Sequence, residues 1–185
     1  AEKGLVVFDG KVEGTASHAA HPNNDNPISK LPNIIKWLEN FSFEKVSNTL
    51  GPVKLTVTQI KAGNQHNVVP ACVDLVVDVR VNDCYSNKEI VAILQKDPPL
   101  TLTPRSLNLN SSSISLNHPL VKAGIELDRS TYGSPTLSDQ AKLSCPSLKL
   151  GPGDSTRSHT ANEFIFVKEI DEAITLYINL LKKIL

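Results

Sequence analysis

The ten residues Cys72–Val81, CVDLVVDVRV, decide the fold of this chain. Apolar side chains occupy every second position, and the apolar set is Val73, Leu75, Val77, Val79 and Val81. Such strict alternation predicts a β-strand with one face against a core and the other toward solvent. Arg80 is expected on the open face, together with Asp74 and Asp78.

The segments on either side of this strand predict the rest of an α+β module. Strand-like alternation recurs at residues 4–14, 54–61 and about 100–109. Asn26 followed by Pro27 marks a helix start, although Pro32 favours a regular helix only from about Leu31. Ser86–Glu89, SNKE, is a capping box for a second helix. The order predicts a four-stranded sheet with two helices on one face, a split pair of strand-helix-strand units, over residues 1–108.

Residues 109–185 are expected to contain mainly helices and loops rather than alternating strands. They predict a short helix at residues 119–127, a short strand at residues 147–150 and a long, packed C-terminal helix. Its apolar positions are Val167, Ile170, Ile174, Tyr177, Leu181 and Ile184. One short strand is too little for an independent core, so this part is expected to complete a domain whose N-terminal portion is absent. The lack of methionine also favours a piece of a longer polypeptide.

Composition narrows the class of protein. The chain has 185 residues, 40% of them hydrophobic and 21% charged, as in a globular protein. The 19 basic and 19 acidic residues cancel, which gives no indication of nucleic-acid or membrane-surface binding. Three cysteines without CxxC spacing indicate neither a disulfide framework nor a cysteine zinc site. A cytoplasmic location is therefore expected.

Four stretches carry residues with possible chemistry. His159 lies in GPGDSTRSHTANE, residues 151–163, before the long helix, where a histidine can bind a metal or simply cap the helix. His18 and His21 lie in GTASHAAHP, residues 14–22, where a loop histidine could donate a hydrogen bond to developing negative charge. Their spacing without a third ligand is a nonspecific metal signal, and solvent-facing polar residues are the simpler interpretation.

The other two stretches surround Asn67 and Ser155. Asn67 falls at a loop-to-strand junction in AGNQHNVVPA, and Arg80 follows on the open face of the next strand. Arg80 could form a bidentate pair with a substrate carboxylate, or an ordinary ion pair with Asp74 or Asp78. Ser155 with His159 and an acid suggests a serine hydrolase, although no GxSxG elbow is present.

Taken in order, these stretches resemble the zinc-dependent acetylornithine deacetylase, succinyl-diaminopimelate desuccinylase and aminoacylase superfamily, and most of all its acetylornithine deacetylase-like branch. The matches are GTASHAAHPNNDNPI, AGNQHNVVPACVDLVVDVRV, SPTLSD and GPGDSTRSHTANE. The resemblance implies that residues 1–108 are a lid or dimerisation domain. It also implies that residues 109–185 are the C-terminal part of an α/β zinc-hydrolase catalytic domain.

By this resemblance, His159 is a ligand of one ion in a two-zinc site. His18 is the lid histidine that stabilises the tetrahedral oxyanion, in dimeric members across the subunit interface. Asn67 and Arg80 contact the substrate, Arg80 through its carboxylate. Glu163 and Asp139 are candidates to hold the second nitrogen of His159. The chain has Asn162 where the family commonly has an aspartate.

The resemblance implies an amidohydrolase that removes an N-acyl group from an amino acid, an N-acetyl or N-succinyl ornithine-type substrate of arginine biosynthesis. A homodimer through residues 1–108 is expected. No HxD motif followed by paired glutamates occurs, so the chain by itself is expected to be inactive. The alternatives are a non-catalytic dimerisation or peptide-binding module that uses an exposed sheet edge, and the serine hydrolase around Ser155.

Overall fold

The computed structural model describes all residues from Ala1 to Leu185, and the chain divides into two compact units. The first, here called the sheet unit, contains Glu2–Ser112 and Gly133–Lys142. The second, the helical unit, contains Ala1, Ser113–Tyr132 and Leu143–Leu185. The chain therefore leaves the sheet unit, returns to it for one short segment, and leaves it again.

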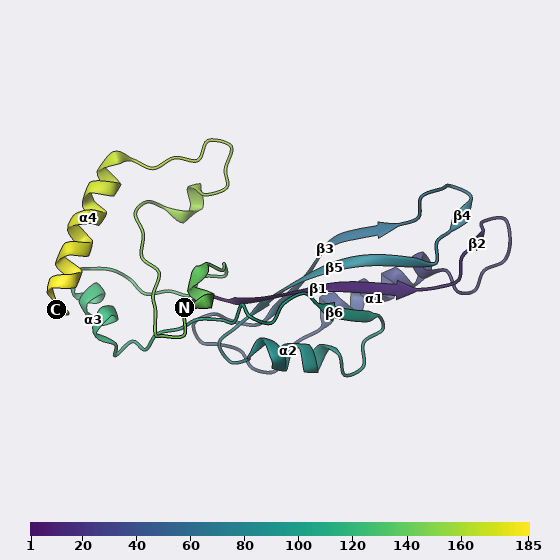
Figure 1. Cartoon of the computed structure of the whole chain (residues 1–185), viewed down its shortest axis with the longest axis horizontal. Helices are drawn as coiled ribbons and strands as arrows, with labels where there is room; N and C mark the ends of the chain where they lie inside the picture. The colour runs from purple at the N-terminus through teal and green to yellow at the C-terminus, as the bar shows by residue number, and fades with distance from the viewer. The chain divides into compact units, whose positions relative to one another are not determined.

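The sheet unit is built on a four-stranded antiparallel sheet with the strand order β3-β5-β1-β6 (Figure 1). Its strands are β1 (Gly4–Glu13), β3 (Lys54–Ala62), β5 (Cys72–Val81) and β6 (Thr101–Pro104). Helices α1 (Pro27–Asn40) and α2 (Asn87–Leu94) contribute to one core against one face of this sheet. The α+β class with a four-stranded sheet and two covering helices is thus confirmed.

The alternation in β5 has the predicted consequence. Its five alternate apolar side chains are at most 2% exposed, and they form the centre of the core with Val6 and Phe8 of β1. Ile34 and Leu38 of α1, together with Ile90 and Leu94 of α2, close the core from the helix side. The other face of β5 carries Asp74, Asp78 and Arg80, as the sequence predicts.

Local capping signals place both helices. The Asn26 side chain accepts from the Ile28 backbone N–H at 2.9 Å, and α1 begins at Pro27, so the expected start near Leu31 is wrong. Pro32 lies inside α1, where it cannot donate to the carbonyl of Ile28. The capping box of α2 is confirmed, since the Glu89 carboxylate accepts from the Ser86 backbone N–H at 2.7 Å.

Short strands are the elements that the sequence predicts least well. β6 covers four residues rather than about ten, and residues 147–150 form no strand, since no strand in the structure pairs with them. Conversely, β2 (Ser17–His18) and β4 (Val68–Val69) form a two-stranded ribbon within segments expected to be loops. Two residues are too few to show a periodic pattern.

Residues 133–142 pack in the sheet unit, although the expected boundary at residue 108 assigns them to the second part. The Lys3 backbone N–H donates to the Ser134 carbonyl at 3.1 Å. The Ser138 hydroxyl donates to the carboxylate of Glu2 at 2.5 Å, and Glu2 is only 2% exposed. A buried carboxylate needs such donors, so this segment holds the start of β1 in place.

The helical unit contains α3 (Pro119–Glu126) and α4 (Val167–Lys182), as predicted. Its buried apolar residues are Val121 and Ala123 in α3 and Ala173 and Leu180 in α4, and Lys183 pairs with Glu126 at 2.7 Å.

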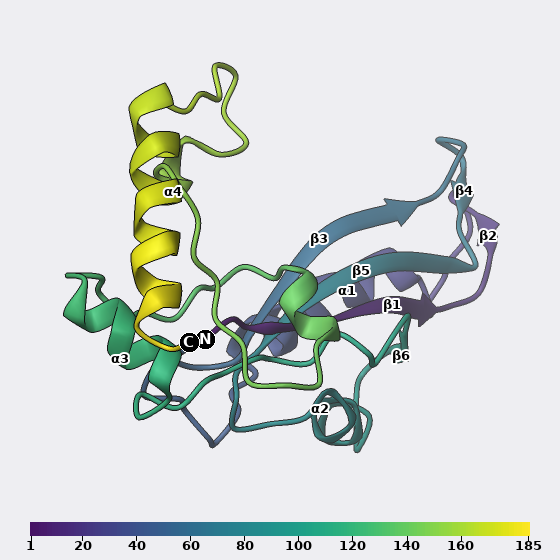
Figure 2. The same cartoon turned by 60° about the vertical axis from the view of Figure 1, so that its left-hand side comes forward.

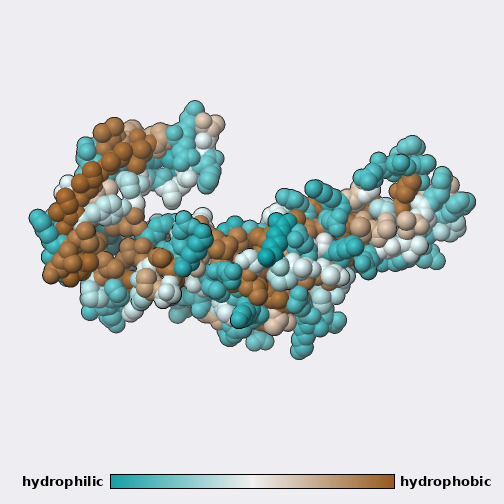
Figure 3. All heavy atoms as spheres, in the orientation of Figure 1, coloured by the Kyte–Doolittle hydropathy of each residue, from teal (hydrophilic) through white to brown (hydrophobic).

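Helix α4 is packed on only part of its apolar surface. An exposed stripe remains beside the packed side, visible as the apolar surface over α4 in Figure 3, and consists of Ile170, Ile174, Ile178 and Leu181. These side chains are 40–53% exposed. The prediction of a fully packed helix is therefore met only in part, because this chain supplies no partner for the stripe. No helix of the structure is both long and apolar enough to cross a membrane.

Replacement of the core side chain Leu75 should be far more destabilising than replacement of its neighbour Val76 on the open face. We expect Leu75→Ala to lower the free energy of unfolding by about 2–5 kcal/mol, because it removes a buried side chain and leaves a cavity. Val76→Ala is the matched control and should cost well under half as much. Guanidinium unfolding of both variants measures the difference, and equal losses would contradict the assigned register.

Candidate functional site

The first candidate site lies at the end of the sheet where β1 ends and β5 begins. The β1–β5 ladder ends with Glu13 opposite Cys72, and Gly14 still donates to the Ala71 carbonyl at 2.8 Å. The two chains then continue outward and pair again as β2 and β4, with His18 opposite Val68 (Figures 1 and 2). The Ala19 backbone N–H donates to the Asn67 carbonyl at 2.9 Å. The β2–β4 ribbon thus brings His18 and Asn67 together.

A single hydrogen bond orients the imidazole of His18. Its Nδ1 accepts from the Ala20 backbone N–H at 3.1 Å. In a neutral imidazole one nitrogen accepts and the other carries the proton, so Nε2 is the donor. His18 is exposed, and its ring lies edge-on to that of His21 with centroids 5.7 Å apart. The exposed Nε2–H can therefore donate to a negatively charged oxygen brought to this ribbon.

The Asn67 side chain is half-buried, and its amide makes no hydrogen bond within the chain. It is available to an external donor or acceptor. Beside it lies an open hollow of about 910 Å³ between β3, β4 and the start of β5. Ile60, Ala62, Val68, Pro70, Ala71 and Cys72 line it together with polar residues that include Lys61, Asn64 and Asp74.

Arg80 lies far from this ribbon. It is eight residues beyond Cys72 along an extended strand, which corresponds to roughly 26 Å at ~3.3 Å per residue. Its Nε and Nη2 donate to the two carboxylate oxygens of Asp78 at 2.7 and 3.0 Å. The ion pair with Asp78 is thus the alternative that the structure contains, and it leaves Nη1 as the uncommitted side of the guanidinium.

The second candidate site is the loop that carries His159, in the helical unit. His159 has a φ of 60°, one of two positive values among the non-glycine residues. Its backbone N–H donates to Glu163 Oε2 at 2.9 Å, whereas the imidazole makes no hydrogen bond. Glu163 therefore holds the backbone of His159 rather than its ring, and Asp139 pairs with Lys142 at 3.1 Å. Left-handed backbone at a non-glycine residue costs energy and is typical of functional loops.

Arg157 is a structural centre of this loop that the sequence does not reveal. Its Nη1 and Nη2 donate to the two Glu169 carboxylate oxygens at 3.0 and 2.5 Å, in the first turn of α4. The guanidinium also lies over the rings of Phe164 and Phe166, at 4.9 and 5.4 Å. The hydrogen bonds from Arg157 and from the Phe166 backbone lower the pKa of Glu169, so its carboxylate stays charged. Neither periodicity nor a motif links these four residues.

The described side chains do not form a complete metal site. The free imidazole of His159 suits one zinc ligand, since zinc binds a neutral imidazole nitrogen. However, no three histidine, cysteine, aspartate or glutamate side chains gather where they could hold a metal ion, and His18 and His21 have no third partner. A complete metal centre is therefore not formed by this chain alone.

A serine hydrolase is not supported by the geometry of the loop. Ser155 begins the short 3-10 helix η2 (Ser155–Arg157), and its backbone carbonyl accepts from Ser158. Its hydroxyl makes no hydrogen bond to His159. A nucleophilic serine needs a base within hydrogen-bonding reach, and that pairing is missing.

The fold and these motifs correspond to a known family. Residues 1–98 match the model of the peptidase dimerisation domain, which is more than half of the chain. The chain therefore belongs to the peptidase dimerisation domain family of the M20 metallopeptidases.

Curated relatives and solved structures extend the similarity beyond this domain. Succinyl-diaminopimelate desuccinylase of Erythrobacter litoralis is 26% identical over 187 residues, covering 95% of this chain and 49% of the relative. The Zymomonas mobilis enzyme of the same name is 34% identical over 96 residues, covering 51% of this chain and 26% of the relative. The chain thus spans about half the length of the full-length desuccinylases that it matches.

Among solved structures, the M20 family metallo-carboxypeptidase Sso-CP2 of Sulfolobus solfataricus has a TM-score of 0.70 at 16% identity, covering 99% of this chain and 59% of that one. A tripeptidase of Staphylococcus aureus has a TM-score of 0.68 at 16% identity, covering 98% and 52%. These likenesses support the fold.

The His18 tautomer can be measured directly. We expect long-range ¹H–¹⁵N correlation spectra of the neutral imidazole to show the proton on Nε2, because Nδ1 accepts from Ala20. His66, which has no such backbone donor, serves as the internal comparison. A neutral His18 that carries its proton mainly on Nδ1 would show that the Ala20 hydrogen bond does not form.

Proposed function

We propose that this chain provides the dimerisation lid and the C-terminal part of the catalytic domain of a zinc amidohydrolase that cleaves the N-acyl amide of an amino acid. The observation that carries the proposal is the orientation of His18 at the exposed end of a peptidase dimerisation domain. Amide hydrolysis passes through a tetrahedral oxyanion, and an oriented N–H donor stabilises that charge. The exposed Nε2–H of His18, with its ring oriented by the Ala20 hydrogen bond, supports this role.

The other site residues have complementary roles in this proposal. The free amide of Asn67 binds polar groups of the substrate beside His18. Arg80 binds the substrate carboxylate through the side of the guanidinium that Asp78 leaves uncommitted. His159 holds one of two zinc ions. When bound, zinc supplies Lewis-acid polarisation of the amide carbonyl and a water that ionises near neutral pH.

The relatives favour an N-succinyl over an N-acetyl substrate. Those named above are desuccinylases, so they do not support the expected acetylornithine-type substrate or a role in arginine biosynthesis. A succinyl group adds a second carboxylate to the substrate. We therefore propose an N-succinyl amino acid as the first substrate class to test.

The exposed stripe of α4 supports the assignment of residues 109–185 to a larger domain. Four exposed aliphatic side chains on one helix face are costly to leave in water. The relatives are about twice the length of this chain, so they contain the additional sequence that could cover such a stripe. We propose that the metal-binding half of the full-length protein packs there.

The wide separation between His18 and Arg80 supports a site shared by two subunits. The roughly 26 Å from Cys72 to Arg80 already exceeds the length of an amino-acid substrate, and His18 lies beyond Cys72 at that end of the sheet. Both residues can serve one substrate only if they come from different subunits. The outer edge of β3 is unpaired and offers backbone groups for a second copy.

An exchange of subunits tests the shared site. In the full-length protein, we expect His18→Ala and His159→Ala each to lose activity, and mixed dimers of the two variants to regain it. One site of the mixed dimer then combines an intact His18 with an intact His159. The readout is release of succinate from an N-succinyl amino acid.

Two controls accompany this measurement. Mixtures of His18→Ala with itself should stay inactive, and the 185-residue chain with added zinc should show no activity, because it holds a single ligand. Activity of the isolated chain, or full activity of His159→Ala, would contradict the zinc assignment.

Sedimentation equilibrium tests the dimer. We expect the chain to be dimeric and Ile60→Pro in β3 to weaken the dimer, because the register of β3 on β5 directs the Ile60 N–H to the unpaired edge and proline removes it. Ile60→Ala, which keeps this N–H, is the matched control and should leave the mass unchanged. A monomeric wild-type chain would instead favour the alternative of a peptide-binding module at the β3 edge.

A further inference from the structure

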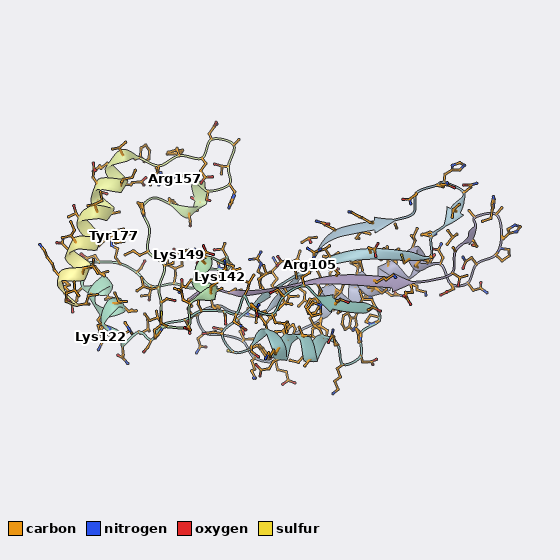
Figure 4. All side chains as sticks on the ribbon, viewed as in Figure 1. Arg105, Lys122, Lys142, Lys149, Arg157 and Tyr177 are labelled. Carbon is orange, nitrogen blue, oxygen red and sulfur yellow. The ribbon has the colours of Figure 1, made fainter.

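The His159 loop is attached to α4 at two points. At its start, the Tyr177 hydroxyl donates to the Leu150 carbonyl at 2.7 Å. Eight residues earlier in the helix, about 12 Å along its axis, Glu169 binds Arg157. Figure 4 labels Arg157 and Tyr177, which mark these two attachment points. These two contacts tie the loop to α4 at Leu150 and at Arg157.

Arg157 is the better fixed of the two attachments. Its side chain is only 18% exposed and that of Glu169 27%, although the surrounding loop is mostly exposed. A bidentate arginine–carboxylate pair fixes both the distance and the relative orientation of the two side chains. The two phenylalanine rings restrict the guanidinium further. Glu169 also accepts from the Phe166 backbone N–H at 3.0 Å, so the same carboxylate caps α4.

The backbone of Arg157 transmits this restraint to His159. The Thr160 hydroxyl donates to the Arg157 carbonyl at 2.8 Å. This hydrogen bond closes a turn over residues 157–160, which contains His159. On the other side, the Glu163 carboxylate accepts the His159 backbone N–H. Asp154 accepts from the backbone N–H and the hydroxyl of Thr156, each at 2.8 Å, and so fixes the turn before Arg157.

This arrangement explains how His159 keeps a φ of 60°. The left-handed conformation costs an L-residue on the order of 1–2 kcal/mol, so it persists only where surrounding contacts demand it. The Glu163 contact and the Thr160 contact are single hydrogen bonds at an exposed surface. The partly buried contacts of Arg157 are the strongest restraint on the loop.

We propose that Arg157 is the positioning residue that keeps His159 in the left-handed conformation and thereby sets the direction of its imidazole, without touching the ring. Its effect on catalysis rests on the proposed zinc role of His159. Its effect on the loop does not.

Nuclear magnetic resonance of the 185-residue chain tests the proposal without any activity measurement. A residue with positive φ gives a strong nuclear Overhauser effect between its own amide and Hα protons. We expect this signal at His159 in the wild-type chain and a severalfold loss in Arg157→Ala. Arg157→Lys should lose it as well, because an ammonium keeps the charge but cannot form the planar two-pronged pair.

Arg129→Ala is the matched control, since Arg129 is an exposed arginine in the same unit whose Nε bonds only to the nearby Leu127 carbonyl. It should leave the His159 signal unchanged. The Leu180 amide, in the packed half of α4, reports whether the helix survives each substitution. If Arg157→Ala melts α4, Phe164→Leu, which removes one stacked ring and keeps the ion pair, takes its place and should reduce the His159 signal by a smaller factor.

An unchanged His159 signal in Arg157→Ala with α4 intact overturns the proposal. A second experiment measures zinc affinity in the full-length protein by competition with a chelator. Arg157→Ala should weaken zinc binding about tenfold or more, because the loss of a residue that supports a metal ligand has an effect of this size. A changed His159 signal with unchanged zinc affinity would support the positioning role and contradict the zinc role of His159.

Discussion

The register of β5 is the constraint on which the sheet unit depends. β5 pairs with β1 on one side and β3 on the other, and its alternate apolar side chains form the centre of the core. A shift by one residue would turn those side chains to solvent and bury Asp74, Asp78 and Arg80. Because the same register ends with Glu13 opposite Cys72, it also delivers His18 and Asn67 to one ribbon. Core packing and site geometry therefore share one cause.

The two candidate sites use different means to present a histidine. His18 is oriented through its ring, by a backbone N–H that occupies Nδ1. His159 is oriented through its backbone, by a left-handed conformation within a loop that Arg157 holds to α4. The first arrangement suits a hydrogen-bond donor, because it defines which nitrogen carries the proton. The second leaves the ring of His159 without a hydrogen bond in this chain, so either nitrogen can accept an external partner.

Two features of the helical unit support the proposal of a larger assembly. The apolar stripe of α4 is exposed, and no three potential metal-ligating side chains gather around His159. The core of the sheet unit, in contrast, is closed by its own two helices. This difference agrees with the match of residues 1–98 to a peptidase dimerisation domain and with the span of about half the length of the desuccinylase relatives.

The sequence by itself determined the long strands, the capping box of α2 and the open face of Arg80, because alternation and capping depend on neighbours along the chain. It also identified His18, Asn67 and His159 as candidates through resemblance. Only the tertiary structure decided that β2 and β4 pair, that Arg80 binds Asp78, and that Arg157 reaches Glu169 between two aromatic rings. Those contacts depend on register, on the choice between two equivalent carboxylates and on loop closure, and none of them leaves a periodic pattern in the sequence.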